Sequence, residues 1–129
     1  MPIYSASFLG DSGRVVLSGR RSFFYMYDAA AGKVEYVRRI VGREEKSWEK
    51  HTVSPDGRTI AFIGNDGNVV LVDGHTKHWI GDLRLNGSVR AVSFSADNSQ
   101  LCASGSDGDI YRCAESEIHL HMFWCGHVT

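Results

Sequence analysis

The sequence predicts an all-β fold in which one strand-rich unit occurs three times. Short runs rich in β-branched and aromatic residues alternate with joints rich in Pro, Asp, Asn and Gly, which is typical of strands connected by tight turns. The order of runs and joints repeats along the chain. Asp66-Gly67 recurs as Asp107-Gly108 after 41 residues, and Asp28 recurs as Asp73 after 45 residues.

The spacing of these copies indicates the architecture. A period of about 40 to 45 residues with four short strands per unit is typical of a blade of a WD-type β-propeller. We expect a partial WD-repeat β-propeller of about three four-stranded blades, at residues 1–41, 42–84 and 85–129. A propeller needs at least about four blades to close. We therefore expect a fragment or a truncated product, with a ring completed by several copies as the alternative.

Blade one is expected to contribute strands at residues 3–8, 15–17, 23–27 and 34–37. The first run alternates apolar and polar residues as a half-buried strand does, whereas the second is continuously apolar. The third run ends at Tyr27-Asp28, where a WD repeat carries Trp-Asp, so Tyr27 takes the place of the tryptophan. Gly32-Lys33 is expected to form the turn before the outer strand.

Blades two and three repeat this order with stronger turn signals. Pro55 sets the backbone angle at the second position of a turn, and Gly57 tolerates positive φ at its end. Asn65-Asp66-Gly67 suits a two- or three-residue hairpin connection. Blade three has Cys113-Ala114 where a Trp-Asp pair is expected, although residues 118–122 still alternate as an outer strand would.

Charge and cysteine content narrow the possible partners and the redox compartment of the protein. The net charge is −1, but residues 1–50 carry nine Lys or Arg against six Asp or Glu, and the remainder carries five against nine. A mildly basic first third leaves contact with an RNA backbone as an alternative to a solvated surface. The three cysteines form no CxxC pair, which argues against a disulfide framework and favours a reducing compartment.

The segment between blades one and two is the candidate docking loop. Its alternating charges are typical of a solvated connection. The alternative is a binding surface on the rim of the propeller, with the basic side chains pairing with carboxylate or phosphate and the tryptophan as an anchor. The residues of this predicted partner-binding loop are Arg43, Glu44, Glu45, Lys46 and Trp48.

A family resemblance rests on five segments of the chain. They are residues 19–28, the Gly32-Lys33 turn, and residues 42–47, 53–57 and 85–90. Together they resemble the family of the U-three small nucleolar RNA-associated WD-repeat protein eighteen over about residues 3 to 112. The resemblance implies a nucleolar scaffold of the small-subunit processome, which acts in processing of the ribosomal RNA precursor. It implies contacts with other propeller and scaffold proteins, and with precursor or small nucleolar RNA as a further partner.

The sequence motifs give little support for a metal site or a catalytic site. His119, His121, Cys125 and His127 lie close together in the sequence, but their spacing matches no standard zinc motif, and we predict no metal site. Cys102 is expected to be a small core residue. Asp66 and Asp107 lack the spacing of a calcium loop and are expected to form turns. The sequence contains no phosphate-binding loop of the GxxxxGK[ST] type, so no cofactor is expected.

The sequence therefore predicts a non-catalytic scaffold in ribosome biogenesis, located in the nucleolus. A generic WD-repeat adaptor in another complex is the first alternative, and a truncated product without independent function is the second. No membrane contact and no small-molecule substrate are expected.

Overall fold

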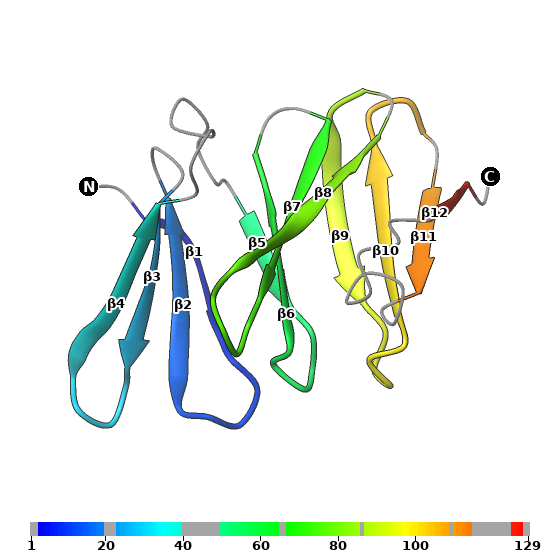
Figure 1. The fold of residues 1–129 in the computed structure, drawn as a ribbon. Helices are drawn as coiled ribbons and strands as arrows, with labels where there is room; N and C mark the ends of the chain where they lie inside the picture. The colour runs from blue at the N-terminus through cyan, green and yellow to red at the C-terminus, as the bar shows by residue number, and fades with distance from the viewer. Residues whose placement is uncertain are drawn as a thin grey trace.

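The structure, a computed structural model, describes residues 3–19, 23–39, 50–64, 67–85, 87–108, 110–114 and 125–127. Within these residues twelve strands form three four-stranded antiparallel sheets. Figure 1 shows the three sheets standing side by side in chain order, with blade one at one end and blade three at the other. The prediction of an all-β partial propeller is confirmed.

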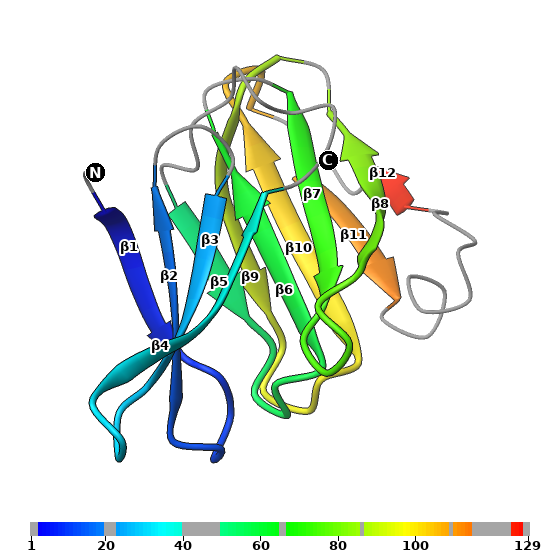
Figure 2. The same cartoon turned by 60° about the vertical axis from the view of Figure 1, so that its left-hand side comes forward.

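Each blade is a meander whose strands follow one another in sheet order. Blade one contains β1 (Ile3–Phe8), β2 (Arg14–Gly19), β3 (Phe23–Asp28) and β4 (Lys33–Arg39). Blade two contains β5 (Lys50–Val53), β6 (Thr59–Ile63), β7 (Asn68–Asp73) and β8 (Trp79–Arg84). Blade three contains β9 (Val89–Phe94), β10 (Gln100–Gly105), β11 (Ile110–Ala114) and β12 (Cys125–His127). The three sheets pack face to face, so in Figure 2 they are seen one behind another.

The turns form where the sequence predicts them. Gly57 has φ +75° and Gly108 has φ +83°, a conformation that glycine adopts without steric cost. Gly32 has φ +69°, and the Asp28 carboxylate accepts hydrogen bonds from the amides of Ala30 and Ala31 at 3.0 and 3.1 Å. In the turn after β3, the short Asp28 side chain thus hydrogen-bonds to the backbone of its own turn.

Blades one and two share one register. Val15 pairs with Tyr27 across β2 and β3, and Ile60 pairs with Val72 across β6 and β7. Each residue of the second pair lies 45 positions after its counterpart in the first. A residue in blade one and its counterpart 45 positions later therefore face the same way.

The core consists of two seams between blades, because successive residues of a strand point to opposite faces of the sheet. The seam between blades one and two buries Leu9, Val16, Phe24, Met26, Ile60, Phe62, Val70 and Val72. The seam between blades two and three buries Ala61, Ile63, Val69, Leu71, Ile80, Leu83, Leu85, Val89, Leu101, Ala103 and Cys113. Both faces of blade two are thus covered, and all five residues of β6 are buried.

The cysteines differ from expectation. Cys102 is exposed, because its side chain is on the face of β10 that points away from blade two, whereas its neighbours Leu101 and Ala103 fill the seam. Cys113 is disulfide-bonded, and the register of β11 and β12 places Cys125 opposite it. The prediction of a core Cys102 is therefore wrong, and Cys113 departs from the expectation of a chain without a disulfide framework. The predicted outer strand at 118–122 lies outside the described residues.

No helix long and apolar enough to cross a membrane occurs in the described part of the chain.

Candidate functional site

The predicted docking loop with Arg43, Glu44, Glu45, Lys46 and Trp48 lies outside the described residues, so its role stays a prediction. The strands that carry it are β4 and β5, which belong to neighbouring blades. The loop therefore connects blade one to blade two.

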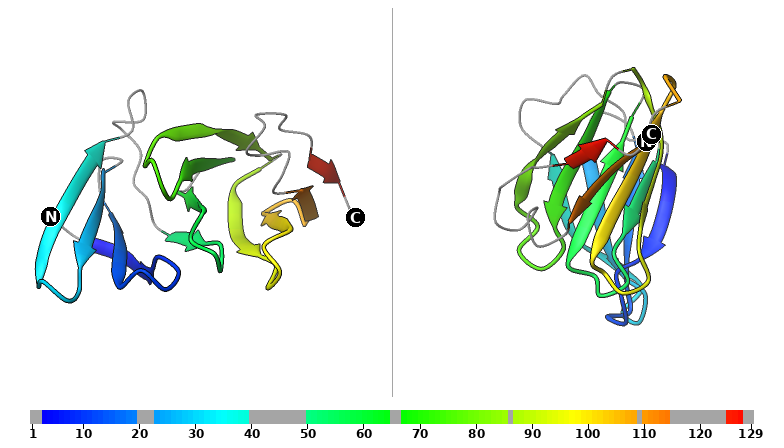
Figure 3. Two further views of the ribbon diagram at one scale, coloured as in Figure 1. Left: turned by 60° about the horizontal axis from the view of Figure 1, so that its bottom comes forward. Right: turned by 90° about the vertical axis from the view of Figure 1, so that its right-hand side faces the viewer.

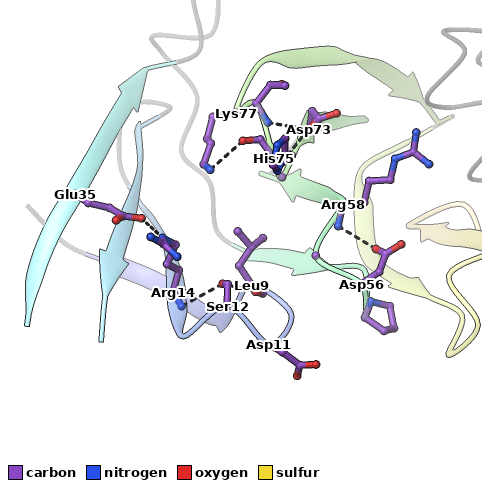
Figure 4. A pocket seen from close by; sticks show the side chains of 14 residues that line it. Leu9, Asp11, Ser12, Arg14, Glu35, Asp56, Arg58, Asp73, His75 and Lys77 are labelled. Carbon is purple, nitrogen blue, oxygen red and sulfur yellow. Dashed lines mark hydrogen bonds and ion pairs between the residues drawn. The ribbon is translucent and has the colours of Figure 1, made fainter. Parts of the chain in front are cut away.

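A groove separates the same two blades where the turns between inner strands emerge. It holds a cavity of about 910 Å³. The left view of Figure 3 turns this end of the blades toward the reader, and Figure 4 shows the groove in detail. Its lining comprises Leu9, Asp11, Ser12, Arg14 and Glu35 from blade one, and Pro55, Asp56, Gly57, Arg58, Asp73, Gly74, His75, Thr76 and Lys77 from blade two.

Glycine backbones form part of the groove, both between the two blades and between two turns of blade two. A Cβ atom on Gly57 would lie 3.4 Å from the backbone of Leu9 and Gly10, across the junction between the blades. A Cβ atom on Gly74 would lie 2.0 Å from the carbonyl oxygen of Gly57. The Gly74 amide donates a hydrogen bond to the Arg58 carbonyl at 2.7 Å. The turns of the groove are therefore packed backbone against backbone, which makes this surface rigid.

The charged side chains on the two walls of the groove have different bonding partners. In blade one, Arg14 forms an ion pair with Glu35, and the hydrogen bond that Arg14 Nε donates to this carboxylate raises the pKa of the guanidinium. In blade two, Asp73 accepts hydrogen bonds from the amides of His75 and Thr76 at 2.8 and 2.9 Å. Lys77 Nζ donates to the His75 carbonyl at 3.0 Å. Figure 4 shows Lys77 and Arg14 facing each other across the groove.

This arrangement offers charged and polar groups for contact with a ligand. Cationic and anionic side chains line one cavity, and its backbone turns fix their positions. Among the described residues no group of three or more His, Cys, Asp or Glu side chains could hold a metal ion. His119 and His121 of the sequence cluster lie outside the described residues.

The turns between inner strands also tie blade two to blade three. Ser54 and Asp56 form a hydrogen-bonded turn that recurs 41 residues later as Ser95 and Asp97. The hydroxyls of Ser99 and Ser95 donate to Asp97 and lower the pKa of its carboxyl to about 2. The Asp56 amide donates to Asn98 Oδ1 at 2.8 Å, so one turn directly contacts the next.

A buried histidine lies in the seam between blades one and two. His51 on β5 shares a hydrogen bond with Ser18 on β2, with Nδ1 and Oγ 2.7 Å apart. Its ring packs against Phe62 at a centroid distance of 5.7 Å. Nε2 is buried and has no hydrogen-bond partner among the described residues. Desolvation lowers the pKa of His51 to about 4.

Acidification is expected to weaken this seam. The pKa of His51 is lower in the folded than in the unfolded chain, so stability is complete above about pH 6.5 and falls as the pH drops towards 4. The expected loss of unfolding free energy is about 3 kcal/mol. Urea unfolding followed by circular dichroism at pH 7.5, 6, 5 and 4 measures it.

His51→Gln is the matched control, because the amide cannot titrate. Its unfolding free energy should change much less between pH 7 and pH 4 than that of the parent chain. An equal pH dependence in both proteins would show that another group is responsible. Asp97 contributes little at pH 5 and above, since the stability from its lowered pKa is present above the unfolded-state value of 3.8 and is lost as the pH falls from there towards 2.

Sequence reasoning missed both the groove and the buried histidine. His51 lies 45 residues after Ala6, and Phe62 lies 45 residues after Leu17, within the same register. Aligning the copies position by position would have placed His51 on a seam-facing row of β5. The groove leaves no such signal, because residues from three separate turns and from strands β2, β4 and β7 form it.

Comparison with known proteins shows clear relatives. The chain is 49% identical over 110 residues, 85% of its length, to an Arabidopsis thaliana protein named "U3 small nucleolar RNA-associated protein 18 homolog". It is 36% identical over 111 residues to the Homo sapiens protein of that name. Each match covers 20% of the relative, so the chain spans about a fifth of the length of these curated relatives.

A shorter match supports the same fold. A segment of 58 residues, 42% of the chain, is 41% identical to a protein of Xenopus tropicalis named "WD repeat-containing protein 1", of which it covers 10%. No family model matches the chain.

Proposed function

The chain is homologous to one segment of the proteins in the U3 small nucleolar RNA-associated protein 18 family, and from this premise we propose that it acts in ribosome biogenesis. Its proposed role is that of a non-catalytic scaffold in assembly of the small-subunit processome and in processing of precursor ribosomal RNA. The proposed location is the nucleolus. The proposed partners are other propeller and scaffold proteins, with precursor or small nucleolar RNA as a further contact.

The observation that carries this proposal is the 49% identity over 85% of the chain to a protein named for association with U3 small nucleolar RNA. The family resemblance read from the sequence agrees with this comparison. The geometry supports a binding role, since blades packed backbone against backbone present a rigid groove between blades one and two.

Two surfaces would provide the scaffold contacts. The docking loop supplies Arg43, Lys46 and the anchor Trp48. The groove supplies a cavity with Arg14 and Lys77 on opposite walls. The strand ends on either side of the loop, Arg39 and Lys50, lie at the end of the blades opposite the turns of the groove, so the two surfaces would contact different parts of a partner (Figure 1).

Arg43→Ala combined with Lys46→Ala tests the docking loop. The double variant is expected to reduce co-purification of processome proteins with the tagged chain at least about fivefold, because two charge-assisted contacts are lost. Thermal stability should remain nearly unchanged, since surface substitutions rarely alter it. Quantitative mass spectrometry of the purified complexes measures the result.

The matched control removes two cations from the far end of the molecule, as Arg90→Ala with Arg112→Ala, both exposed in blade three. It should leave co-purification at the parental level. Unaltered co-purification of the loop variant would reject the loop as a docking site. Equal losses in both double variants would show that overall charge, rather than the loop, determines binding.

A generic WD-repeat adaptor in a different complex is the second candidate, and the match to a WD repeat-containing protein of another name favours it. The location of the tagged chain in the cell distinguishes the two functions. Nucleolar fluorescence of the tagged chain, together with enrichment of U3 RNA in its precipitates, is expected for the first function. A diffuse cytoplasmic signal without U3 RNA would support the second.

A further inference from the structure

Lys77, which lines the groove between blades one and two, has a backbone conformation that lysine rarely adopts. Its φ is +65°, in the left-handed region, where the Cβ atom of an L-residue crowds the following carbonyl oxygen. Among the described residues, Asn98 is the only other residue besides glycine with a positive φ. Asparagine is enriched in this region, whereas lysine is not.

The corresponding turn of blade one has glycine at this position. Gly32 lies 45 residues before Lys77 and has φ +69°. The two turns form the same hydrogen bond, in which the amide of Gly32 or Lys77 donates at 2.8 Å to the carbonyl of Asp28 or Asp73. Glycine adopts the conformation without steric cost, so the turn does not need a lysine. A strained residue that the turn does not require points to a use of its side chain.

The side chain of Lys77 faces a second cation across the groove. Its Nζ donates to the His75 carbonyl at 3.0 Å, which orients the ammonium. Figure 4 shows it opposite Arg14, whose Nε donates to Glu35. An ammonium has three N–H donors and a guanidinium has five, so each can bind a further acceptor. Cations from two blades thus converge on one cavity.

The carboxylates that line the groove do not supply this acceptor. Glu35 is paired with Arg14, and the carboxylates of Asp56 and Asp73 accept backbone amides of their own turns. Figure 4 shows Asp11 pointing away from Arg14. We therefore expect the two cations to take their further acceptor from a ligand.

The charge of the whole lining selects the kind of anion. The cationic side chains are Arg14, Arg58 and Lys77, and the carboxylates are Asp11, Glu35, Asp56 and Asp73. A nucleic-acid strand brings several phosphates, which these carboxylates would repel. A single carboxylate between Lys77 and Arg14 gains charge-assisted hydrogen bonds from both. The lining therefore favours one acidic side chain over a polyphosphate.

We propose that the groove binds an aspartate or glutamate side chain of a partner protein between Lys77 and Arg14. The proposal rests on the proposed scaffold function, which supplies the partner, and it names the chemistry of one contact. Because turns packed backbone against backbone hold both walls, little conformational freedom is lost when the carboxylate binds.

Selection from a phage library of random decapeptides on the complete 129-residue chain tests the proposal. The selected peptides are expected to share Asp or Glu at one fixed position. Fluorescence anisotropy of a labelled selected peptide gives its dissociation constant. Replacement of its acidic residue by Asn or Gln should raise that constant at least about tenfold, because hydrogen bonds to a charged group are lost.

Two variants of Lys77 separate binding from stability. Lys77→Gly should raise the dissociation constant of the peptide at least about tenfold, while the thermal midpoint stays the same or rises because glycine removes the strain. Lys77→Arg keeps the charge and the strain, so it should bind at least about threefold more tightly than Lys77→Gly without a gain in stability. Lys33→Ala is the matched control, because it removes an exposed cation at the corresponding turn of blade one. It should bind as the parent does.

Carbodiimide cross-linking of the complexes that co-purify with the tagged chain is the second measurement. This reagent joins an amine directly to a carboxylate that touches it, so mass spectrometry should find Lys77 linked to Asp or Glu of another protein. Absence of that link while U3 RNA still co-precipitates would overturn the proposal and leave the proposed function standing. Absence of U3 RNA would count against the proposed function instead.

Three results of the selection would also overturn the proposal. They are enrichment of no peptide, peptides without a fixed acidic residue, and peptide binding that Lys77→Gly leaves unchanged. Labelled oligouridylate provides the comparison with RNA. If it binds and Lys77→Gly abolishes its binding while acidic peptides do not bind, the site belongs to phosphate and the proposal is wrong.

Discussion

Phe62→Ala is expected to lower the unfolding free energy by about 3 to 5 kcal/mol. Phe62 is completely buried on β6, at the centre of the seam between blades one and two. Its ring lies 5.2 Å from that of Phe24 and 5.7 Å from that of His51, so truncation would leave a cavity bounded by both blades. Urea unfolding monitored by circular dichroism measures the change.

Ile110→Ala provides the comparison, because it truncates a large apolar residue that is 44% exposed in blade three. Its expected cost is about 0.5 kcal/mol. A cost for Phe62→Ala below about 1 kcal/mol would contradict the assignment of this seam as a main source of stability. A loss of the thermal transition confined to blade-one probes would locate the damage to that seam.

Gly74→Ala is expected to destabilise the protein by about 3 kcal/mol or more, although it adds only one methyl group. The new Cβ atom would lie 2.0 Å from the Gly57 carbonyl oxygen and 3.1 Å from its carbonyl carbon. Both are backbone atoms of a turn packed against blade one, so no side chain can move aside. The turns must separate, which breaks the hydrogen bond between the Gly74 amide and Arg58.

Gly13→Ala distinguishes overlap from backbone strain. Gly13 has φ +74°, but a Cβ atom there would meet nothing within 4 Å. The expected cost is about 1 to 2 kcal/mol, from the left-handed conformation alone. If thermal unfolding shows equal losses for the two variants, close approach at Gly74 is not what limits substitution.

The repeat in the sequence predicted the blades because their turns depend on local chemistry. Asp28, Gly57 and Gly108 act within a few residues of their own positions, so a sequence pattern is enough to place them. The strands between them follow from β-branched and aromatic runs. The predicted docking loop, from Arg43 to Trp48, could not be compared with the structure because it lies outside the described residues.

The parts that sequence could not predict depend on which face of a strand is covered. Cys102 lies in an apolar run, yet it is exposed because no blade packs on its side of β10. Ser18 and His51 come from different blades and meet only across a seam. The groove likewise requires the turns of two blades to be placed relative to each other, which no local signal specifies.

Burial of both faces of blade two affects the order in which the blades unfold. Ile60 and Phe62 are shielded by one neighbour, and Ala61 and Ile63 by the other. Water therefore cannot reach β6 and β7 until one of the two neighbouring blades has separated from blade two. Melting should begin at one edge and proceed inward, with β6 and β7 the last strands to exchange their amide protons.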